Sequence, residues 1–344
     1  MKMWKGDSFL KELYEQTASR RALENEGRAP DERKQRMKER LESSLGEFNL
    51  TGQGQVQPKL LERIEFADYT RERVELSIVE GLSFGAYLLI PKGVPGKLPG
   101  VIAVHGHGYG SRQICGMLAD GTPDPGHTDI YRHFALELVR LGMVVIAPDV
   151  IGFGERALQS DLDADPESPS SCYMMSAQLL MMGKTLTGLR VAEMRGALDY
   201  FAGREEVDPS RIGIAGFSGG SLIAYVTAVL DERIRAVNLI GFPNTFKDSI
   251  MAVHHCVCNY TPGILEIGEL PELIGLIAPR PLFLESGDRD PIFPKRGFEL
   301  AAEELRAIYR DAGAEDRFGW DLFPGVHEVS GRRSFGWLKQ MLQS

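Results

Sequence analysis

The sequence predicts an α/β fold in which helices flank a mostly parallel sheet, and three observations support this class. Beyond Pro91, short apolar runs alternate with segments of helical periodicity, and such alternation is typical of a parallel sheet with right-handed crossovers. The apolar runs are continuous, as in strands that are buried on both faces. The chain has 344 residues, of which 43% are hydrophobic and 25% charged, so it can bury a substantial core.

A helical arm is expected before the sheet. Apolar residues recur at helical spacing from Phe9 to Ala22, behind a candidate N-cap at Asp7 or Ser8. Pro30, followed by two acidic residues, is typical of the first turn of a second helix. We expect this arm to pack on the main domain or on a second copy of the chain, which would make the protein a homo-oligomer.

Strands are expected between residues 60 and 90, joined by turns at Asp68 and at Glu80-Gly81. The later strands are expected at residues 101–104, 143–147, 212–215, 237–240, 281–285 and 318–323, and the helices between them at 131–140, 189–201, 222–230, 298–311 and 335–342. A sheet of this kind binds ligands at the carboxyl ends of its strands. The residues that directly follow the strands are therefore the candidate functional residues.

The predicted organisation is a helical arm over residues 1–55 and one catalytic domain over residues 56–344. Two connections within this domain, near residues 155–184 and 243–280, are longer than a simple crossover requires. We interpret these two insertions as a small cap over a pocket rather than as an independent domain.

Charge and hydropathy exclude several classes of partner. The formal net charge is −9 without a basic face in the main body, which argues against nucleic acid as a partner. No run of about 18 apolar residues exists, so no membrane span is expected. The N-terminus lacks the continuous apolar stretch of a secretory signal, and we expect a cytoplasmic protein.

The four cysteines do not predict a disulfide scaffold, because they are few and scattered in a long chain. They are Cys115, Cys172, Cys256 and Cys258. Residues 254–258 combine two histidines with two of these cysteines, but they lack a second ligand pair at zinc-like spacing. We expect no metal site here, and instead buried thiols and hydrogen-bonded histidines beside a pocket.

The strongest chemical signal is Gly216-Phe217-Ser218-Gly219-Gly220. A G-x-S-x-G match is weak by itself, but here a short buried strand precedes it and a helical pattern follows it. A strand-to-helix elbow holds its serine in strained backbone geometry, which only small flanking residues permit. The sequence therefore predicts that Ser218 is a nucleophile exposed above the sheet.

A serine hydroxyl needs a base to take its proton, and the base needs a carboxylate to fix its tautomer. His327 follows the last expected strand and precedes the terminal helix, which makes it the candidate base. Both Asp288 and Asp290 follow the strand at 281–285. We favour Asp290 on its spacing and read Asp288 as a turn residue, while Glu285 lies within the strand and is expected to be structural.

An oxyanion hole requires two N–H donors that are in place before reaction. One is expected from the backbone of Gly219 and the other from the glycine-rich loop at residues 105–110, at His107. A phosphate-binding loop is the competing interpretation of this segment. The lysine and hydroxyl that a P-loop requires are absent from it.

From about residue 60 to the end, the chain resembles the α/β-hydrolase superfamily. The resemblance is carried by residues 105–108, 147–149, 152–154, 216–220, 287–294 and 325–327. In detail it resembles the acetyl xylan esterase-like and dienelactone hydrolase-like branch, and residues 278–281 strengthen that placement. The resemblance implies an eight-stranded, mostly parallel sheet, a triad in the order Ser, Asp, His, and no cofactor. Dienelactone hydrolases in the strict sense use cysteine as nucleophile, and this chain departs from them at Ser218.

Together these residues predict a serine carboxylic ester hydrolase that acts through an acyl-enzyme on a small-molecule ester. A preference for short acyl groups, and for acetylated carbohydrate in particular, is implied by the resemblance alone. An amidase, a peptidase or a carbon–carbon bond hydrolase could use the same triad. A non-catalytic binding protein with this fold would be signalled by a lost triad residue, and none is lost here.

Overall fold

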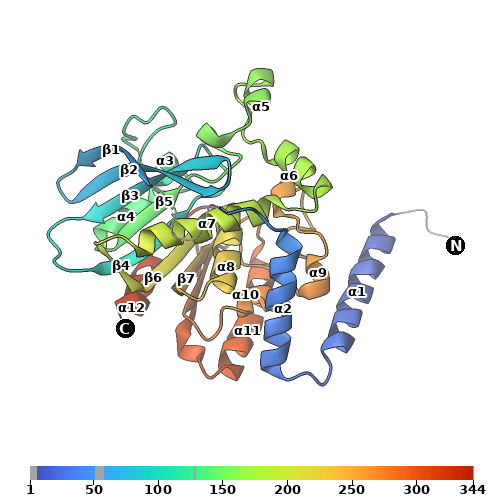
Figure 1. Cartoon of the computed structure of the whole chain (residues 1–344). Coiled ribbons are helices and arrows are strands. Elements are labelled where there is room, and N and C mark those ends of the chain that lie inside the picture. The colour runs from blue at the N-terminus through green and yellow to red at the C-terminus, as the bar shows by residue number, and fades with distance from the viewer. Residues whose placement is uncertain (1–5, 51–57, 127–128, 344) are drawn as a thin grey trace.

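The structure is a computed structural model, and it describes residues 6–50, 58–126 and 129–343. Within these residues the strands form one nine-stranded sheet in the order β1-β2-β3-β5-β4-β6-β7-β8-β9, with helices on both sides (Figure 1). The strands are β1 (Lys59–Glu65), β2 (Tyr69–Val79), β3 (Leu82–Pro91), β4 (Leu98–Val104), β5 (Val144–Pro148), β6 (Val207–Phe217), β7 (Ile234–Ile240), β8 (Leu282–Gly287) and β9 (Phe318–Phe323). The predicted α/β class is confirmed.

The α-helices surround this sheet and fill the two long connections. They are α1 (Gly6–Asn25), α2 (Pro30–Leu45), α3 (Ser111–Ile114), α4 (Phe134–Arg140), α5 (Gln159–Ala164), α6 (Cys172–Met181), α7 (Leu186–Ala202), α8 (Gly219–Leu230), α9 (Ile264–Ile267), α10 (Leu270–Gly275), α11 (Lys295–Asp311) and α12 (Ser334–Gln343). Among the described residues, three short 3₁₀ turns accompany them: η1 (Gly154–Arg156), η2 (Val257–Asn259) and η3 (Glu315–Arg317). No helix of the described residues is long and apolar enough to span a bilayer.

The sheet is antiparallel at its N-terminal edge and parallel elsewhere. Strands β1, β2 and β3 form an antiparallel meander, and β3 pairs antiparallel with β5. From β5 through β4, β6, β7 and β8 to β9, neighbouring strands are parallel. The expected number of eight strands is corrected to nine, because β1 pairs along β2 and extends the sheet at this edge.

The central parallel strands are buried on both faces because their side chains alternate between two apolar cores. On β4, Ile102 and Val104 belong to the core beneath α7 and α8, whereas Val101 and Ala103 belong to the core beneath α4 and α12. Each fully buried aliphatic side chain contributes about 1.5–3 kcal/mol to folding. This two-sided burial holds the carboxyl ends of β4, β6 and β8 in fixed positions.

The N-terminal arm contacts the main body through both of its helices. On α2, Met37, Leu41 and Leu45 are buried, and this helix packs on α7, α8 and α9. Helix α1 packs on α9, yet the side chains of Phe9 and Leu10 are 64% and 60% exposed. The proposed boundary of the arm at residue 55 lies outside the described residues.

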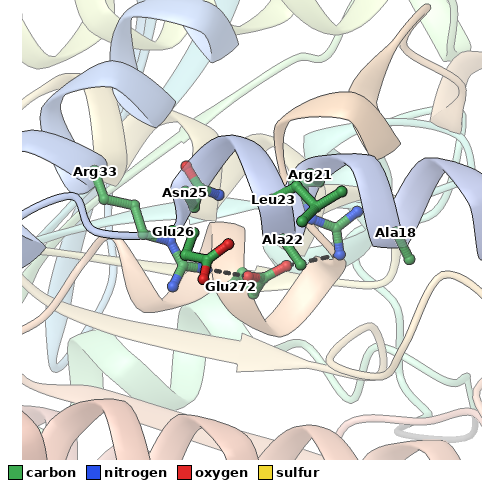
Figure 2. Close-up of a pocket in the computed structure, with 8 residues that line it drawn as sticks. All are labelled: Ala18, Arg21, Ala22, Leu23, Asn25, Glu26, Arg33 and Glu272. Atoms are coloured by element: carbon green, nitrogen blue, oxygen red, sulfur yellow. Dashed lines mark hydrogen bonds and ion pairs between the residues drawn. The ribbon is translucent and has the colours of Figure 1, made fainter.

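Helix α1 is attached to the main body mainly by polar contacts. Glu272 of α10 forms ion pairs with Arg21 of α1 and with Arg33 of α2 (Figure 2). The Tyr14 hydroxyl donates to Glu269, and Arg21 also donates to the carbonyl of Leu265. Helix α1 is therefore fastened to the α9–α10 region largely by polar and charged side chains.

The two long connections lie against each other. The first contains α5 and α6, and the second contains η2, α9 and α10. Helix α6 packs on η2, so residues far apart in the sequence meet close to the carboxyl end of β4.

Candidate active site

Ser218 occupies a sharp elbow between β6 and α8. Its backbone has φ 55° and ψ −124°, a conformation that costs a non-glycine residue about 1–3 kcal/mol. The flanking glycines allow close backbone contacts: a Cβ at Gly216 would lie 2.3 Å from the carbonyl oxygen of Gly220, and one at Gly220 would lie 2.1 Å from that of Val104. The motif therefore requires glycine on both sides of the serine for steric reasons.

A continuous chain of hydrogen bonds links Ser218, His327 and Asp290. The Ser218 Oγ lies 3.0 Å from Nε2 of His327, and Nδ1 of His327 lies 2.7 Å from Oδ2 of Asp290. The other carboxylate oxygen of Asp290 accepts the backbone N–H groups of Ile292 and Phe293 at 2.8 and 3.0 Å. Because Nδ1–H donates a hydrogen bond to the carboxylate, Nε2 carries no proton and can accept the proton of the serine.

The other two carboxylates predicted near this loop have different partners. Asp288 Oδ1 accepts the N–H of Gly325 at 3.0 Å, and its side chain is 38% exposed. Glu285 is buried and accepts hydrogen bonds from the N–H groups of Ser330 and Gly331 and from the hydroxyl of Ser334. Burial raises the pKa of Glu285 above its usual range. Both residues support the loop that carries His327.

The loop after β4 lies directly against the serine elbow. A Cβ at Gly106 would lie 3.0 Å from the Ser218 Cβ, and one at Gly219 would lie 3.4 Å from His107 Nδ1. The carbonyl of His107 accepts the Tyr131 hydroxyl at 2.8 Å. In the part of the chain that the structure describes, the N–H groups of His107 and Gly219 donate to no other group, so both remain available beside Ser218.

His105 holds the start of this loop in place. Its Nε2 accepts the N–H of Val150 at 3.0 Å, so the proton resides on Nδ1, which lies 2.8 Å from the Gly106 carbonyl. Burial lowers the pKa of His105 to about 4. His105 is therefore neutral and structural, with both ring nitrogens in use.

A pocket of about 330 Å³ opens above the serine. It is lined by His107, Ile130, Tyr131, Phe217, Ser218, Val253, His254, His255, Cys256, Pro291, Ile292 and His327. Residues 253–256 come from the second insertion, which contributes one wall. Nε2 of His255 is buried and has no hydrogen-bond partner among the described residues. Burial, reinforced by the charges of His107 and His327, lowers the pKa of His255 to about 4, so its ring is neutral at neutral pH.

Another pocket, of about 410 Å³, lies between α1, α2 and α10 (Figure 2). Its charged residues include Glu272, which pairs with both Arg21 and Arg33. Its lining contains neither a hydroxyl nucleophile nor a histidine or cysteine. Its carboxylates, Glu26 and Glu272, have neither a nucleophile nor an imidazole beside them in this lining, so the triad chemistry expected from the sequence cannot take place here.

The predicted site residues thus lie together at the carboxyl edge of the sheet. They are Ser218, His327, Asp290, His107 and Gly219. Sequence reasoning did not single out the contributions of Tyr131, His105 and His255. Tyr131 and His105 act on the loop after β4 through long-range contacts, which sequence spacing does not reveal. His255 was noted only within the cluster at residues 254–258.

Comparisons with known proteins show the family of the chain. The model of the Abhydrolase family matches residues 47–319. "Putative hydrolase YtaP" of Bacillus subtilis (strain 168) is 31% identical over 243 residues, which cover 67% of this chain and 73% of that protein.

Solved structures share the fold at low identity. A putative acetyl xylan esterase of Bacteroides fragilis NCTC 9343 superposes with a TM-score of 0.72 at 18% identity, covering 88% of this chain and 81% of that one. A glucuronoyl esterase from Solibacter usitatus gives a TM-score of 0.64 at 13% identity, covering 90% and 91%. The fold, the serine elbow and the matched family together identify the chain as a member of the Abhydrolase family, the α/β-hydrolases.

Proposed function

We propose that the protein hydrolyses carboxylic esters through an acyl-enzyme formed on Ser218. The observation that carries this proposal is the unbroken hydrogen-bonded chain from Ser218 Oγ through His327 to the buried carboxylate of Asp290. A serine placed in this way is activated by its neighbouring base, whereas an isolated serine hydroxyl is a weak nucleophile.

The reaction follows from the positions of these groups. His327 Nε2 removes the proton of Ser218 as its Oγ attacks the ester carbonyl, and Asp290 stabilises the imidazolium that forms. The N–H groups of Gly219 and His107 receive the developing oxyanion. His327 then returns the proton to the leaving alcohol, and the same sequence with water as nucleophile releases the acid and restores Ser218.

A short acyl ester is the proposed substrate class. The pocket of about 330 Å³ is small and combines apolar residues such as Ile130 and Ile292 with the imidazoles of His254 and His255. Such a mixed surface suits a small acyl group attached to a polar alcohol. The acetyl xylan esterase named among the structural neighbours adds support for acetylated carbohydrate as the natural class.

A series of p-nitrophenyl esters of increasing acyl length, with the corresponding anilide as control, tests this proposal. We expect turnover to be highest for acetate and to fall as the chain lengthens, with little cleavage of the anilide. Faster cleavage of the anilide would instead support an amidase. Absence of turnover for every compound, together with tight binding of one of them, would support a binding protein.

A further inference from the structure

Four potential metal ligands meet beside the loop after β4. They are His107, Cys172, Cys256 and Cys258, and their ligand atoms all lie within 4.8 Å of one another. His107 belongs to the loop after β4, Cys172 begins α6, and the other two cysteines lie at η2. The cluster therefore joins three segments that are far apart in the sequence.

The separations fit a tetrahedral site and not a disulfide. Sγ of Cys258 lies 3.5 Å from His107 Nε2 and 3.3 Å from Sγ of Cys256. With zinc–sulfur bonds of about 2.3 Å, the sulfur atoms of a tetrahedral site are roughly 3.7 Å apart. A disulfide would require about 2.05 Å. Small movements of side chains would thus place all four atoms around one ion.

Charge provides an independent reason to expect a metal. Arg190 is 2% exposed, and its guanidinium lies 3.2 Å from Sγ of Cys172. Its other hydrogen bonds reach the carbonyl of Ile151, and within residues 6–50, 58–126 and 129–343 no carboxylate pairs with it. A buried cation is costly without a counter-charge. One divalent ion with three thiolates carries a net charge of −1, which Arg190 neutralises.

Burial of the sulfur atoms strengthens this inference. Cys172 and Cys258 are 0% and 2% exposed, whereas Cys256 is half-buried at the wall of the pocket. The sulfur atoms therefore lie away from bulk solvent, as in a structural site whose four positions are all filled by protein ligands.

We propose that His107, Cys172, Cys256 and Cys258 bind one zinc ion as a structural site. Three thiolates and one imidazole are a common ligand set of structural zinc, and four protein ligands leave no open position for a substrate. Coordination through Nε2 places the His107 proton on Nδ1, the ring nitrogen closest to Gly219. The ion would fasten α6 and η2 to the loop after β4.

This site differs from the expectation of no metal, which depended on the absence of a second ligand pair near residues 254–258. The structure supplies that pair as His107 and Cys172, while His254 and His255 of the same run are not part of the cluster. A consequence for activity rests on the proposed function, because the zinc would fix the backbone N–H of His107 beside Ser218.

Metal content of the full-length protein, purified from zinc-supplemented medium, tests the site directly. We expect about one equivalent of zinc in the wild type and in Cys115→Ala, a matched control at a buried cysteine outside the cluster. Cys172→Ser and Cys256→Ser should each lose most of it. Zinc well below one equivalent in the wild type, full zinc in Cys172→Ser, or a Cys256–Cys258 disulfide by mass spectrometry would overturn the proposal. Stoichiometric iron or copper would contradict the assignment of zinc.

Two further measurements remain decisive if a cysteine variant fails to fold. Wild-type protein loaded with Co²⁺ should show the intense visible bands of tetrahedral cobalt and thiolate-to-cobalt charge-transfer absorption, and weak octahedral bands would contradict the ligand set. Chelation should lower Tm by at least about 5 °C in wild type and in Ser218→Ala alike. Because Ser218→Ala removes the nucleophile and leaves the ligands intact, loss of activity and loss of zinc are distinguished.

Discussion

At the scale of single residues, the identity of the carboxylate partner decides which nitrogen of His327 carries the proton. Asp290 accepts a hydrogen bond from Nδ1–H of His327. An amide at this position can donate to Nδ1 instead, which favours the tautomer in which Nε2 is protonated and cannot act as a base. We expect Asp290→Asn to lower kcat by about 10⁴-fold, measured on p-nitrophenyl acetate.

Asp288→Asn is the matched control for this variant. Its oxygen can still accept the N–H of Gly325, so we expect kcat within a few-fold of wild type and a stability loss of about 1 kcal/mol or less. A folded but inactive Asp288→Asn protein, with Asp290→Asn active, would reverse the two roles.

The buried histidine at position 105 predicts a loss of stability in acid. Its pKa is lowered from 6.5 to about 4 by burial, so between these pH values the unfolded chain binds more protons than the folded chain. The contribution of His105 to the free energy of unfolding is therefore complete above pH 6.5 and is lost as the pH falls toward 4. The loss amounts to about 3 kcal/mol.

Urea unfolding of wild type and His105→Gln across this pH range measures the effect. We expect a shallower pH dependence for His105→Gln, whatever its stability at neutral pH, and the wild-type dependence for His254→Gln at an exposed position. Part of the pH dependence should remain in both variants, because the pKa of His255 is also lowered. An unchanged slope in His105→Gln would show that this ring is not held neutral in the fold.

At the scale of elements, the contact between α8 and β4 determines how close the serine elbow can approach the loop after β4. A Cβ at Gly220 would lie 2.1 Å from the carbonyl oxygen of Val104, and this backbone atom cannot move without separating the two elements. We expect Gly220→Ala to destabilise the protein by about 3 kcal/mol or more, as measured by denaturant unfolding.

Gly336 on α12 provides the opposite case. A Cβ there would meet nothing within 4 Å, and alanine is favoured over glycine within helices by about 0.5–1 kcal/mol. Gly336→Ala should therefore be neutral or slightly stabilising. Equal destabilisation by the two substitutions would contradict the steric role assigned to Gly220.

The elements that periodicity predicted are those long enough to show a pattern. The predicted strand at 318–323 has the same bounds as β9, and the predicted helix at 222–230 lies within α8. Helix α9 spans Ile264–Ile267, which is too short for a helical repeat to appear in the sequence. Its position depends on tertiary contacts with α1 and α2, and local spacing contains no information about them.

At the scale of the whole molecule, the candidate site could be predicted where its residues follow strands in a known chain order. Ser218 follows β6, Asp290 follows β8 and His327 follows β9. The topology of a parallel sheet is therefore enough to bring the three residues together. The cluster of His107, Cys172, Cys256 and Cys258 depends instead on how two insertions fold against each other. Sequence spacing identified only its last two residues.

The N-terminal arm raises a question of assembly at this scale. Helix α1 leaves Phe9, Leu10, Leu13 and Leu23 exposed, while its contacts with α9 and α10 include several polar ones. Association of two copies through this arm remains a proposal. Likewise, a cytoplasmic location and the absence of nucleic-acid partners remain predictions from the sequence.

Acid-quenched mass spectrometry during turnover of p-nitrophenyl acetate tests the proposed nucleophile most directly. We expect one acetyl group on the peptide that contains Ser218, none on the same peptide of Ser218→Ala, and a loss of turnover in that variant of roughly 10⁴-fold or more. Acetate release at the wild-type rate by Ser218→Ala, or an acetyl group carried by another residue during turnover, would contradict an acyl-enzyme on Ser218.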